Sequence, residues 1–253
     1  MPQTLCRLWI VAALALLAMP SKAGAAETII AVASNFAAPA KEIAAAFALK
    51  TGHTVVLSFG STGQFYTQIT QDAPIGVLLA ADAETPKKIA DNGLAVAGST
   101  FTYAIGRLVL WAKNPALPAG ETVLKSGAFE TLACANPKLA PYGAAAVETL
   151  HTLGLYDLLM PKLVWGNTIA QTFQFVDTGN ADLGFVALSQ VITKAGRSYW
   201  LVPETLHAPI RQDAILLAKG ATDPVAQAFL DFLKGPEALL VMGIYGYGTA
   251  SAP

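Results

Sequence analysis

Hydroxyl and amide side chains stand at two places where the sequence pattern changes from strand to helix. Ser34 and Asn35 follow the apolar, β-branched run at 28–33, and Ser61 and Thr62 follow a similar run at 54–59. The start of a helix leaves backbone N–H groups without partners and carries the positive end of the helix dipole. Hydroxyl and N–H donors in such a place bind anions. These four residues therefore predict an anion site built from neutral donors.

A simpler interpretation is that Ser34 and Thr62 only cap their helices, since Ser, Thr and Asn are the preferred N-cap residues. Two junctions on neighbouring strands favour a shared site, because ligands of open α/β sheets bind at the carboxyl ends of the strands. Gly60 and Gly63 flank the second junction and let a ligand approach the backbone. No Gly-Lys-Ser/Thr follows, so the junction is not a P-loop.

Two later stretches precede expected helices in the same way. Tyr142, between Pro141 and Gly143, offers a phenol, whereas Ile169 offers only its backbone N–H. Loop packing is the simpler interpretation of both residues. None of the four junctions contains Arg or Lys. Phosphate, which can carry a proton, would need an acceptor such as Asp, so neutral donors favour a fully ionised tetrahedral dianion.

The sequence contains no pattern that indicates catalysis. His53, His151 and His207 are scattered without metal-ligand spacing, and there is no Gly-x-Ser-x-Gly or Cys-x-x-Cys. Asp82 follows an expected strand but has no partner that the sequence identifies. We therefore expect a binding protein, with no catalytic residues and no cofactor.

Composition narrows the class of partner. Sixteen basic and 17 acidic residues give a net charge of −1, which argues against a nucleic-acid partner. This balance also means that overall charge does not attract an anion. With Cys6 in a removable leader, Cys134 is alone and forms no disulfide within the chain. We expect it to be a small buried residue rather than a reactive thiol.

The N-terminus has the features of a secretory signal. Arg7 precedes an apolar run at 8–19, and small residues follow a break at Pro20. This run is shorter than the about 20 apolar residues of a transmembrane helix. We predict that residues 1–26 are a cleaved signal peptide, cut after Ala25 or Ala26, and that the protein is periplasmic. The alternative is an uncleaved membrane anchor.

Strands and helices alternate along the rest of the chain, which predicts an α/β fold with largely parallel sheets. Strands are expected at 28–33, 54–59, 75–80, 108–112, 132–135, 183–187 and 215–218. Helices are expected at 37–50, 62–70, 86–92, 144–153, 173–178, 225–233 and 236–242.

In their order and spacing, these junctions resemble the periplasmic molybdate-binding proteins of ABC transport systems, over essentially the whole mature chain. The residues that carry the resemblance are Ala33-Ser34-Asn35-Phe36, Phe59-Gly60-Ser61-Thr62-Gly63, Ala73-Pro74, Ala80-Ala81-Asp82, the run 101–111, Asn136-Pro137, Ala140-Pro141-Tyr142-Gly143, the run 178–187, Leu233-Lys234-Gly235-Pro236 and Tyr245-Gly246-Tyr247.

The resemblance implies a two-lobe type II periplasmic-binding fold, each lobe a mainly parallel sheet flanked by helices. Residues 27–106 and 207–253 would form lobe I and 107–206 lobe II, with the ligand in the cleft. It implies a monomeric receptor that captures molybdate or tungstate for an inner-membrane ABC permease. The ligand contacts it implies are Ser34, Asn35, Ser61, Thr62, Tyr142 and Ile169, and the only metal is the molybdenum of the bound anion.

One position departs from part of the family. Some members have a ligand-binding tyrosine just after the strand at 183–186, where this chain has Ala187. Tyr142 would supply the phenol instead. Two alternatives stay open: a receptor for sulfate or another small anion on the same fold, and a periplasmic enzyme acting on a phosphorylated substrate.

Overall fold

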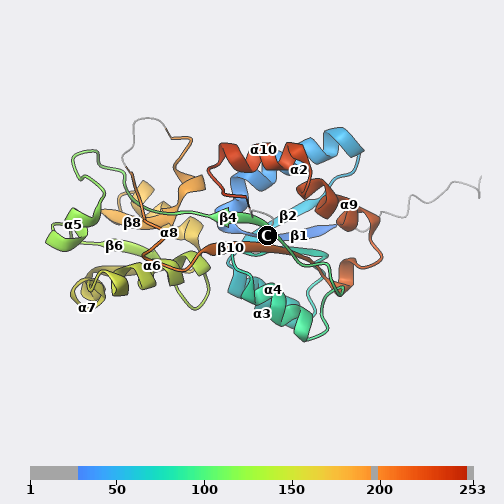
Figure 1. The fold of residues 1–253 in the computed structure, drawn as a ribbon, viewed down its shortest axis with the longest axis horizontal. Helices are drawn as coiled ribbons and strands as arrows, with labels where there is room; N and C mark the ends of the chain where they lie inside the picture. Colours follow the sequence, from blue (N-terminus) through green and yellow to red (C-terminus); the bar gives the residue numbers. More distant parts are fainter. Residues whose placement is uncertain (1–27, 195–198, 250–253) are drawn as a thin grey trace, which may run out of the picture.

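The computed structural model describes residues 28–194 and 199–249, which form two α/β lobes side by side along the long axis of the molecule (Figure 1). The expected signal peptide, residues 1–26, lies outside the described residues. Within the described part of the chain, no helix is long and apolar enough to cross a membrane.

We call the half that contains both the first and the last described elements lobe I. Its strands are β1 (Ile29–Ala33), β2 (Val56–Gly60), β3 (Val77–Leu79), β4 (Phe101–Gly106) and β10 (Ile210–Leu216). Its helices are η2 (Ser34–Phe36), α2 (Ala37–Thr51), α3 (Thr62–Thr70), α4 (Glu84–Asp91), η5 (Ala218–Gly220), α9 (Pro224–Leu233) and α10 (Pro236–Ile244), the η elements being short 3-10 helices.

Lobe II is the half formed by the middle of the chain. Its strands are β5 (Leu108–Ala112), β6 (Leu132–Ala135), β7 (Leu163–Gly166), β8 (Leu183–Ala187) and β9 (Tyr199–Leu201). Its helices are α5 (Glu121–Ser126), α6 (Pro141–Thr152), α7 (Tyr156–Leu159), η3 (Met160–Lys162), α8 (Ile169–Asp177) and η4 (Leu188–Gln190).

Each lobe holds one five-stranded sheet covered by helices on both faces. The strand order is β2-β1-β3-β10-β4 in lobe I and β7-β6-β8-β5-β9 in lobe II. In lobe I, α2, α9 and α10 pack on one face and α3 and α4 on the other (Figure 1). In lobe II, α6 covers one face and α8 the other.

The double cover explains the composition of the strands. Side chains alternate between the two faces of a strand, so a strand buried on both faces is apolar throughout. In β5, Leu108 and Leu110 join the core beneath α6, whereas Val109 and Trp111 join the core beneath α8. All four side chains are 0% exposed.

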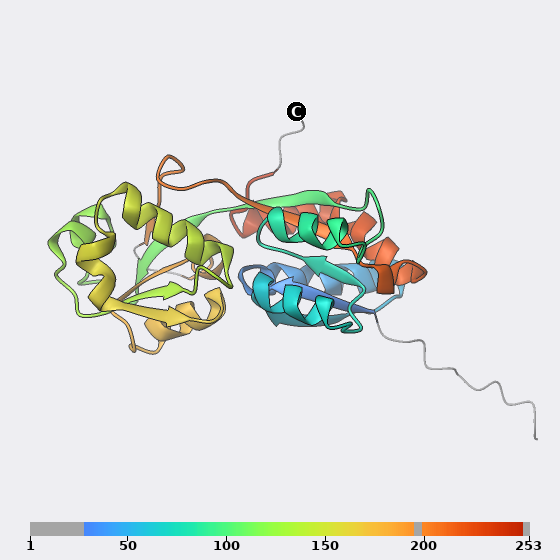
Figure 2. The ribbon, with the colours of Figure 1, turned by 90° about the horizontal axis from the view of Figure 1, so that it is seen from below.

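The chain crosses between the lobes twice, from β4 into β5 and from β9 into β10, and both crossings run along the same edge of the molecule (Figure 2). The crossings explain why the sheets are mixed. β1 is parallel to β2 and β3, and β6 to β7 and β8, but β5 and β10 are antiparallel to both of their neighbours.

The predicted two-lobe α/β fold with mainly parallel sheets is therefore confirmed. Four of the five strands in each sheet run in one direction, and only β10 in lobe I and β5 in lobe II run against them. A parallel pair needs a crossover connection, usually a helix. β5 and β10 instead enter their sheets directly from the other lobe, which lets them run antiparallel to their neighbours.

Candidate functional site

A small cavity between the lobes brings together all six residues that the sequence singles out. The cavity has a volume of about 10 Å³, the space of about one water-sized sphere. It is lined by Ala33, Ser34, Asn35, Gly60, Ser61, Thr62, Ala81, Ala140, Pro141, Tyr142 and Ile169. In this arrangement of the lobes the cavity has no room for an extended ligand.

The register of two parallel strands brings the lobe I residues together. Ala33, the last residue of β1, pairs with Gly60, the last residue of β2. The two strands thus end level with each other, and the residues that follow them, Ser34 and Ser61, open the next helices side by side. This is the convergence that the sequence pattern predicts for neighbouring strands.

Ser61, rather than Ser34 or Thr62, is the helix cap. Its Oγ accepts a hydrogen bond from the Gln64 backbone N–H (3.4 Å), and its own N–H donates to Gln64 Oε1 (3.0 Å). This reciprocal pair is a capping box. The interpretation of Ser34 and Thr62 as simple N-caps is therefore wrong, since Thr62 lies one residue inside α3 and Ser34 makes no cap bond.

The hydroxyl groups of Ser34 and Thr62 both have a proton to donate. Thr62 Oγ1 accepts from the Ala81 N–H at 3.0 Å, so its own proton is free for another acceptor. Ser34 Oγ is buried and has no hydrogen-bond partner in the described part of the chain. A buried polar atom without a partner is costly unless a ligand completes it. The Ser34 hydroxyl is the most direct sign of a bound polar group.

Lobe II contributes two helix starts. Tyr142 is the second residue of α6, and Ile169 is the first residue of α8, which Thr168 caps by accepting from the Gln171 N–H at 3.0 Å. Tyr142 and Ile169 are 1% and 3% exposed. Because the side chain of Ile169 is apolar, only its backbone N–H can serve a polar ligand.

The cavity is electrically neutral. Within residues 28–194 and 199–249, no side chain that lines it belongs to Asp, Glu, Lys, Arg or His. Burial raises the pKa of the Tyr142 phenol well above its usual 10, so the phenol stays protonated and can donate. The arrangement offers hydroxyl and N–H donors without a counter-ion, which suits a fully ionised oxyanion.

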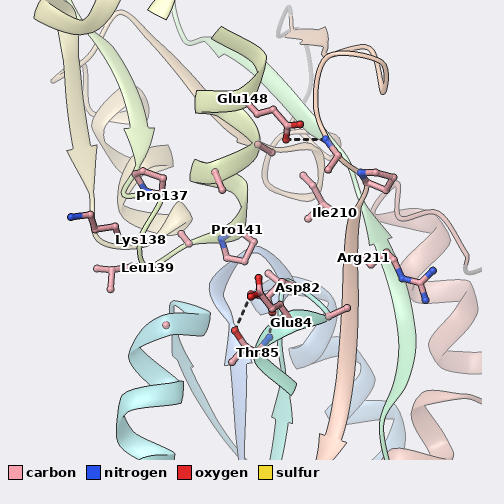
Figure 3. A pocket seen from close by; sticks show the side chains of 18 of the residues that line it. Asp82, Glu84, Thr85, Pro137, Lys138, Leu139, Pro141, Glu148, Ile210 and Arg211 are labelled. Carbon is pink, nitrogen blue, oxygen red and sulfur yellow. Dashed lines mark hydrogen bonds between the residues drawn. The ribbon is translucent and has the colours of Figure 1, made fainter. Parts of the chain in front are cut away.

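A larger groove of about 560 Å³ opens next to the cavity and shares Ala81, Ala140 and Pro141 with it (Figure 3). Asp82 lies in this groove. Its carboxylate accepts from the N–H (2.7 Å) and hydroxyl (3.2 Å) of Thr85, at the start of α4. Burial raises the pKa of Asp82, and these hydrogen bonds oppose the rise.

The described residues contain no group of three or more His, Cys, Asp or Glu side chains that could hold a metal ion. Cys134 is 0% exposed, and burial raises the pKa of its thiol. A thiol in that state is a poor nucleophile. The expectation that Cys134 is a small buried residue is confirmed.

The sequence did not identify four residues that lie behind the cavity as part of the site: Tyr103, Ser189, Gln212 and Tyr247. They hydrogen-bond to Asn35, to Tyr142 or to one another. Gln212 was hidden because the apolar run placed the last strand at 215–218, whereas β10 begins at Ile210. Arg211, Gln212 and Asp213 are three polar residues in a row, so no local pattern marks Gln212 as buried.

Comparisons with known proteins show which proteins this chain is similar to. Residues 29–248 match the model of a family described as bacterial extracellular solute-binding protein. The molybdate-binding protein ModA of Rhodobacter capsulatus is 56% identical over 233 residues, covering 92% of each chain. ModA of Azotobacter vinelandii is 56% identical over 230 residues, covering 89% of this chain and 91% of the relative.

Solved structures show the same fold. The periplasmic molybdate-binding protein of Azotobacter vinelandii superposes with a TM-score of 0.86 at 38% identity, covering 89% of this chain and all of that one (100%). The sulfate-binding protein SubI of Mycobacterium tuberculosis H37Rv reaches 0.71 at 14% identity, over 88% of this chain and 86% of that one. This second likeness shows the fold alone. By its sequence and its fold, the chain belongs to the bacterial extracellular solute-binding protein family.

Proposed function

We propose that this protein is a periplasmic receptor that captures molybdate between its lobes and delivers it to an inner-membrane ABC permease. The observation that carries the proposal is the neutral, buried cavity between four helix starts, in which the Ser34 hydroxyl has no hydrogen-bond partner among the described residues. The names of relatives that are 56% identical over most of the chain point to molybdate as the anion.

The contacts we propose follow from the donors that each residue has left. The hydroxyls of Ser34, Ser61 and Thr62 and the phenol of Tyr142 donate from side chains. Asn35 and Ile169 donate from their backbone N–H groups at the helix starts. Donors from both lobes meet on one anion, so binding holds the lobes closed.

Tungstate has the same charge and tetrahedral shape, and we propose that it binds the same donors. We also propose that the receptor works as a monomer and catalyses no reaction. A mature protein that begins at residue 26 or 27 would agree with cleavage of the expected signal peptide, and mass spectrometry of the exported protein measures this.

Titration calorimetry of the mature protein with molybdate, tungstate, sulfate and phosphate tests the ligand. We expect one molybdate or tungstate per chain, little heat from sulfate, and none from phosphate, whose proton would meet donors only. Equal affinity for sulfate would contradict the molybdate assignment and favour a sulfate receptor on the same fold. Steady turnover of model phosphate esters would favour an enzyme instead.

Delivery to a permease is tested separately. With the cognate permease and its ATPase in liposomes, the loaded receptor should stimulate ATP hydrolysis and molybdate uptake. Binding without either effect would leave a receptor whose partner is a sensor rather than a transporter.

A further inference from the structure

A buried network of polar side chains lies directly behind the anion cavity and joins the two lobes. Gln212 of β10 is 0% exposed. Its Oε1 accepts from Asn35 Nδ2 at 2.9 Å and from Tyr103 Oη at 3.0 Å. Its Nε2 donates to Tyr142 Oη at 3.1 Å. Because Gln212 belongs to lobe I and Tyr142 to lobe II, this last bond crosses the interface.

The neighbours of Gln212 determine which way its amide points. An amide has an acceptor oxygen on one side and a donor nitrogen on the other. The Asn35 amide donates to the oxygen, and the Tyr103 hydroxyl, which is 3.0 Å from both this oxygen and the Ala80 carbonyl, has one proton for the two acceptors. The nitrogen of Gln212 faces Tyr142. A second hydrogen bond orients the Asn35 amide, because its Nδ2 donates to Tyr247 Oη at 3.0 Å as well as to Gln212.

This orientation determines where the proton of Tyr142 can go. A phenol has one proton, and a phenol oxygen that accepts from Gln212 must turn that proton elsewhere. The remaining directions are the cavity, which Tyr142 lines, and the Tyr247 hydroxyl. With Gln212 reversed, its amide oxygen would take the proton and Tyr142 would have none for an anion.

Burial keeps both phenols protonated. It raises the pKa of Tyr142 well above its usual 10 and also raises the pKa of Tyr247. Tyr142 therefore has one proton to give, and an anion in the cavity would compete with the Tyr247 hydroxyl for it.

The backbone leaves room for the contact between Gln212 and Tyr142. A Cβ at Gly106 would lie 2.2 Å from Tyr142 Oη and 2.5 Å from Gln212 Nε2, so only glycine fits there. Next to Gln212 the register of β4 and β10 slips by one residue, and Tyr103 is the extra residue of β4. Such a bulge redirects side chains, and here Tyr103 reaches the amide oxygen of Gln212.

We propose that Gln212 is a positioning residue for anion capture, which directs the phenolic proton of Tyr142 into the cavity when the lobes close. Gln212 and Tyr142 lie in different lobes, so the complete set of donors exists only in the closed form. The inference rests on the proposed function, because it concerns how the captured oxyanion is held.

A double-mutant cycle tests this by titration with molybdate. Gln212→Met removes the amide at similar length and should weaken binding about tenfold, the factor for about one lost hydrogen bond. In a Tyr142→Phe background the same change should alter affinity by less than about twofold, because no phenolic proton is left to direct. Equal losses in both backgrounds would show a purely structural role and overturn the proposal.

A second variant gives an independent readout if Gln212→Met folds poorly. In Gln212→Glu the introduced carboxyl can donate to Tyr142 only while it is protonated. Once ionised, it accepts the Tyr142 proton and repels the dianion. We expect molybdate binding to this variant to weaken as pH rises, while binding to the wild type stays level. The exposed Gln227→Glu adds the same charge in lobe I as a control and should behave like the wild type.

The outcomes separate this inference from the proposed function. A wild-type protein that binds no tetrahedral oxyanion would contradict both the proposed function and the inference about Gln212. Two results would contradict the inference alone, provided that the wild type binds tightly. One is a molybdate affinity of Gln212→Glu that does not change with pH, and the other is additive losses in the double-mutant cycle.

Discussion

At the scale of single residues, the hydroxyls that line the cavity differ in whether they also accept a hydrogen bond from the protein backbone. Ser61 is committed to its capping box with Gln64, and Thr62 accepts from the Ala81 N–H. The buried Ser34 hydroxyl has no hydrogen-bond partner among the described residues. Removing Ser34 and removing Thr62 should therefore have different consequences, although both side chains line the same cavity.

Ser34→Ala should weaken molybdate binding by about 1.5–3 kcal/mol, the range for a hydrogen bond to a charged group. The thermal stability of the ligand-free protein should stay the same, because no protein group loses a partner. Thr62→Val should also weaken binding, but it leaves the Ala81 N–H unpaired and should lower the free energy of unfolding by about 1–3 kcal/mol. Calorimetry gives the affinities and denaturant titration the stabilities.

The pair of variants is its own control. If Ser34→Ala lost as much stability as Thr62→Val, the Ser34 hydroxyl would have a protein partner. If Ser34→Ala bound molybdate as tightly as the wild type, the hydroxyl would not contact the anion.

Sequence reasoning reached the six cavity residues because each lies at a strand-to-helix junction, where donor types are informative by themselves. It took Thr62 rather than Ser61 as the possible cap, because that choice depends on a helix boundary within one residue. Tyr103, Gln212 and Tyr247 were out of reach for a different reason. Their role comes from contacts between positions more than 100 residues apart, such as Tyr103 and Gln212 (109 residues).

At the scale of elements, the start of α3 does more than supply donors, because it also touches lobe II directly. The Gly63 N–H donates to the Leu139 carbonyl at 2.9 Å. A Cβ at Gly63 would lie 3.1 Å from Leu139 Cα and 3.3 Å from the Lys138 carbonyl oxygen. The closed arrangement therefore depends on a glycine that lets the two backbones meet.

Gly63→Ala should weaken molybdate binding, since the added methyl group holds the lobes a few tenths of an ångström apart. The ligand-free protein should be no less stable, because alanine favours the helix by about 0.5–1 kcal/mol. Gly243→Ala in α10 is the matched control, where a Cβ meets nothing within 4 Å, and it should leave affinity unchanged. Wild-type affinity in Gly63→Ala would mean that lobe II yields to the methyl group.

The strands that sequence reasoning located to the residue, β5, β6 and β8, are those buried on both faces, since continuous apolar runs mark them. It missed β4, β7 and β9. β7 contains the exposed Trp165, and β9 contains the exposed Tyr199 and Leu201. β4 mixes half-buried residues such as Thr102 with buried residues such as Tyr103, without a regular alternation. Pairing across the sheet, rather than local pattern, makes these segments strands.

At the scale of the whole molecule, capture relies on shape and hydrogen bonds rather than on charge. The chain carries a net charge of −1, and no charged side chain in the described residues lines the cavity. An anion therefore gains no attraction over long distances. This separates the site from one built around Arg or Lys.

Molybdate affinity should thus change little with salt or pH. Raising the ionic strength from about 0.01 M to about 1 M shortens the Debye length from about 30 Å to about 3 Å, but there is no surface attraction to screen. Tyr142 loses its donor proton only above its raised pKa, so affinity should stay level from about pH 6 to about pH 9. A steep fall with salt, or a loss near neutral pH, measured by calorimetry, would reveal an ionisable ligand contact.

The position of β10 has a consequence for the order in which the protein can fold. β10 lies between β3 and β4 in the lobe I sheet, although more than 100 residues of chain separate it from β4. Lobe II, by contrast, is built from one continuous stretch, from β5 to β9. In a chain that emerges N-terminus first, lobe II can complete its core before β10, an inner strand of the lobe I sheet, has been synthesised. Lobe I thus begins to form first and is completed last. The cleft between the two lobes forms only when synthesis of the chain is nearly finished.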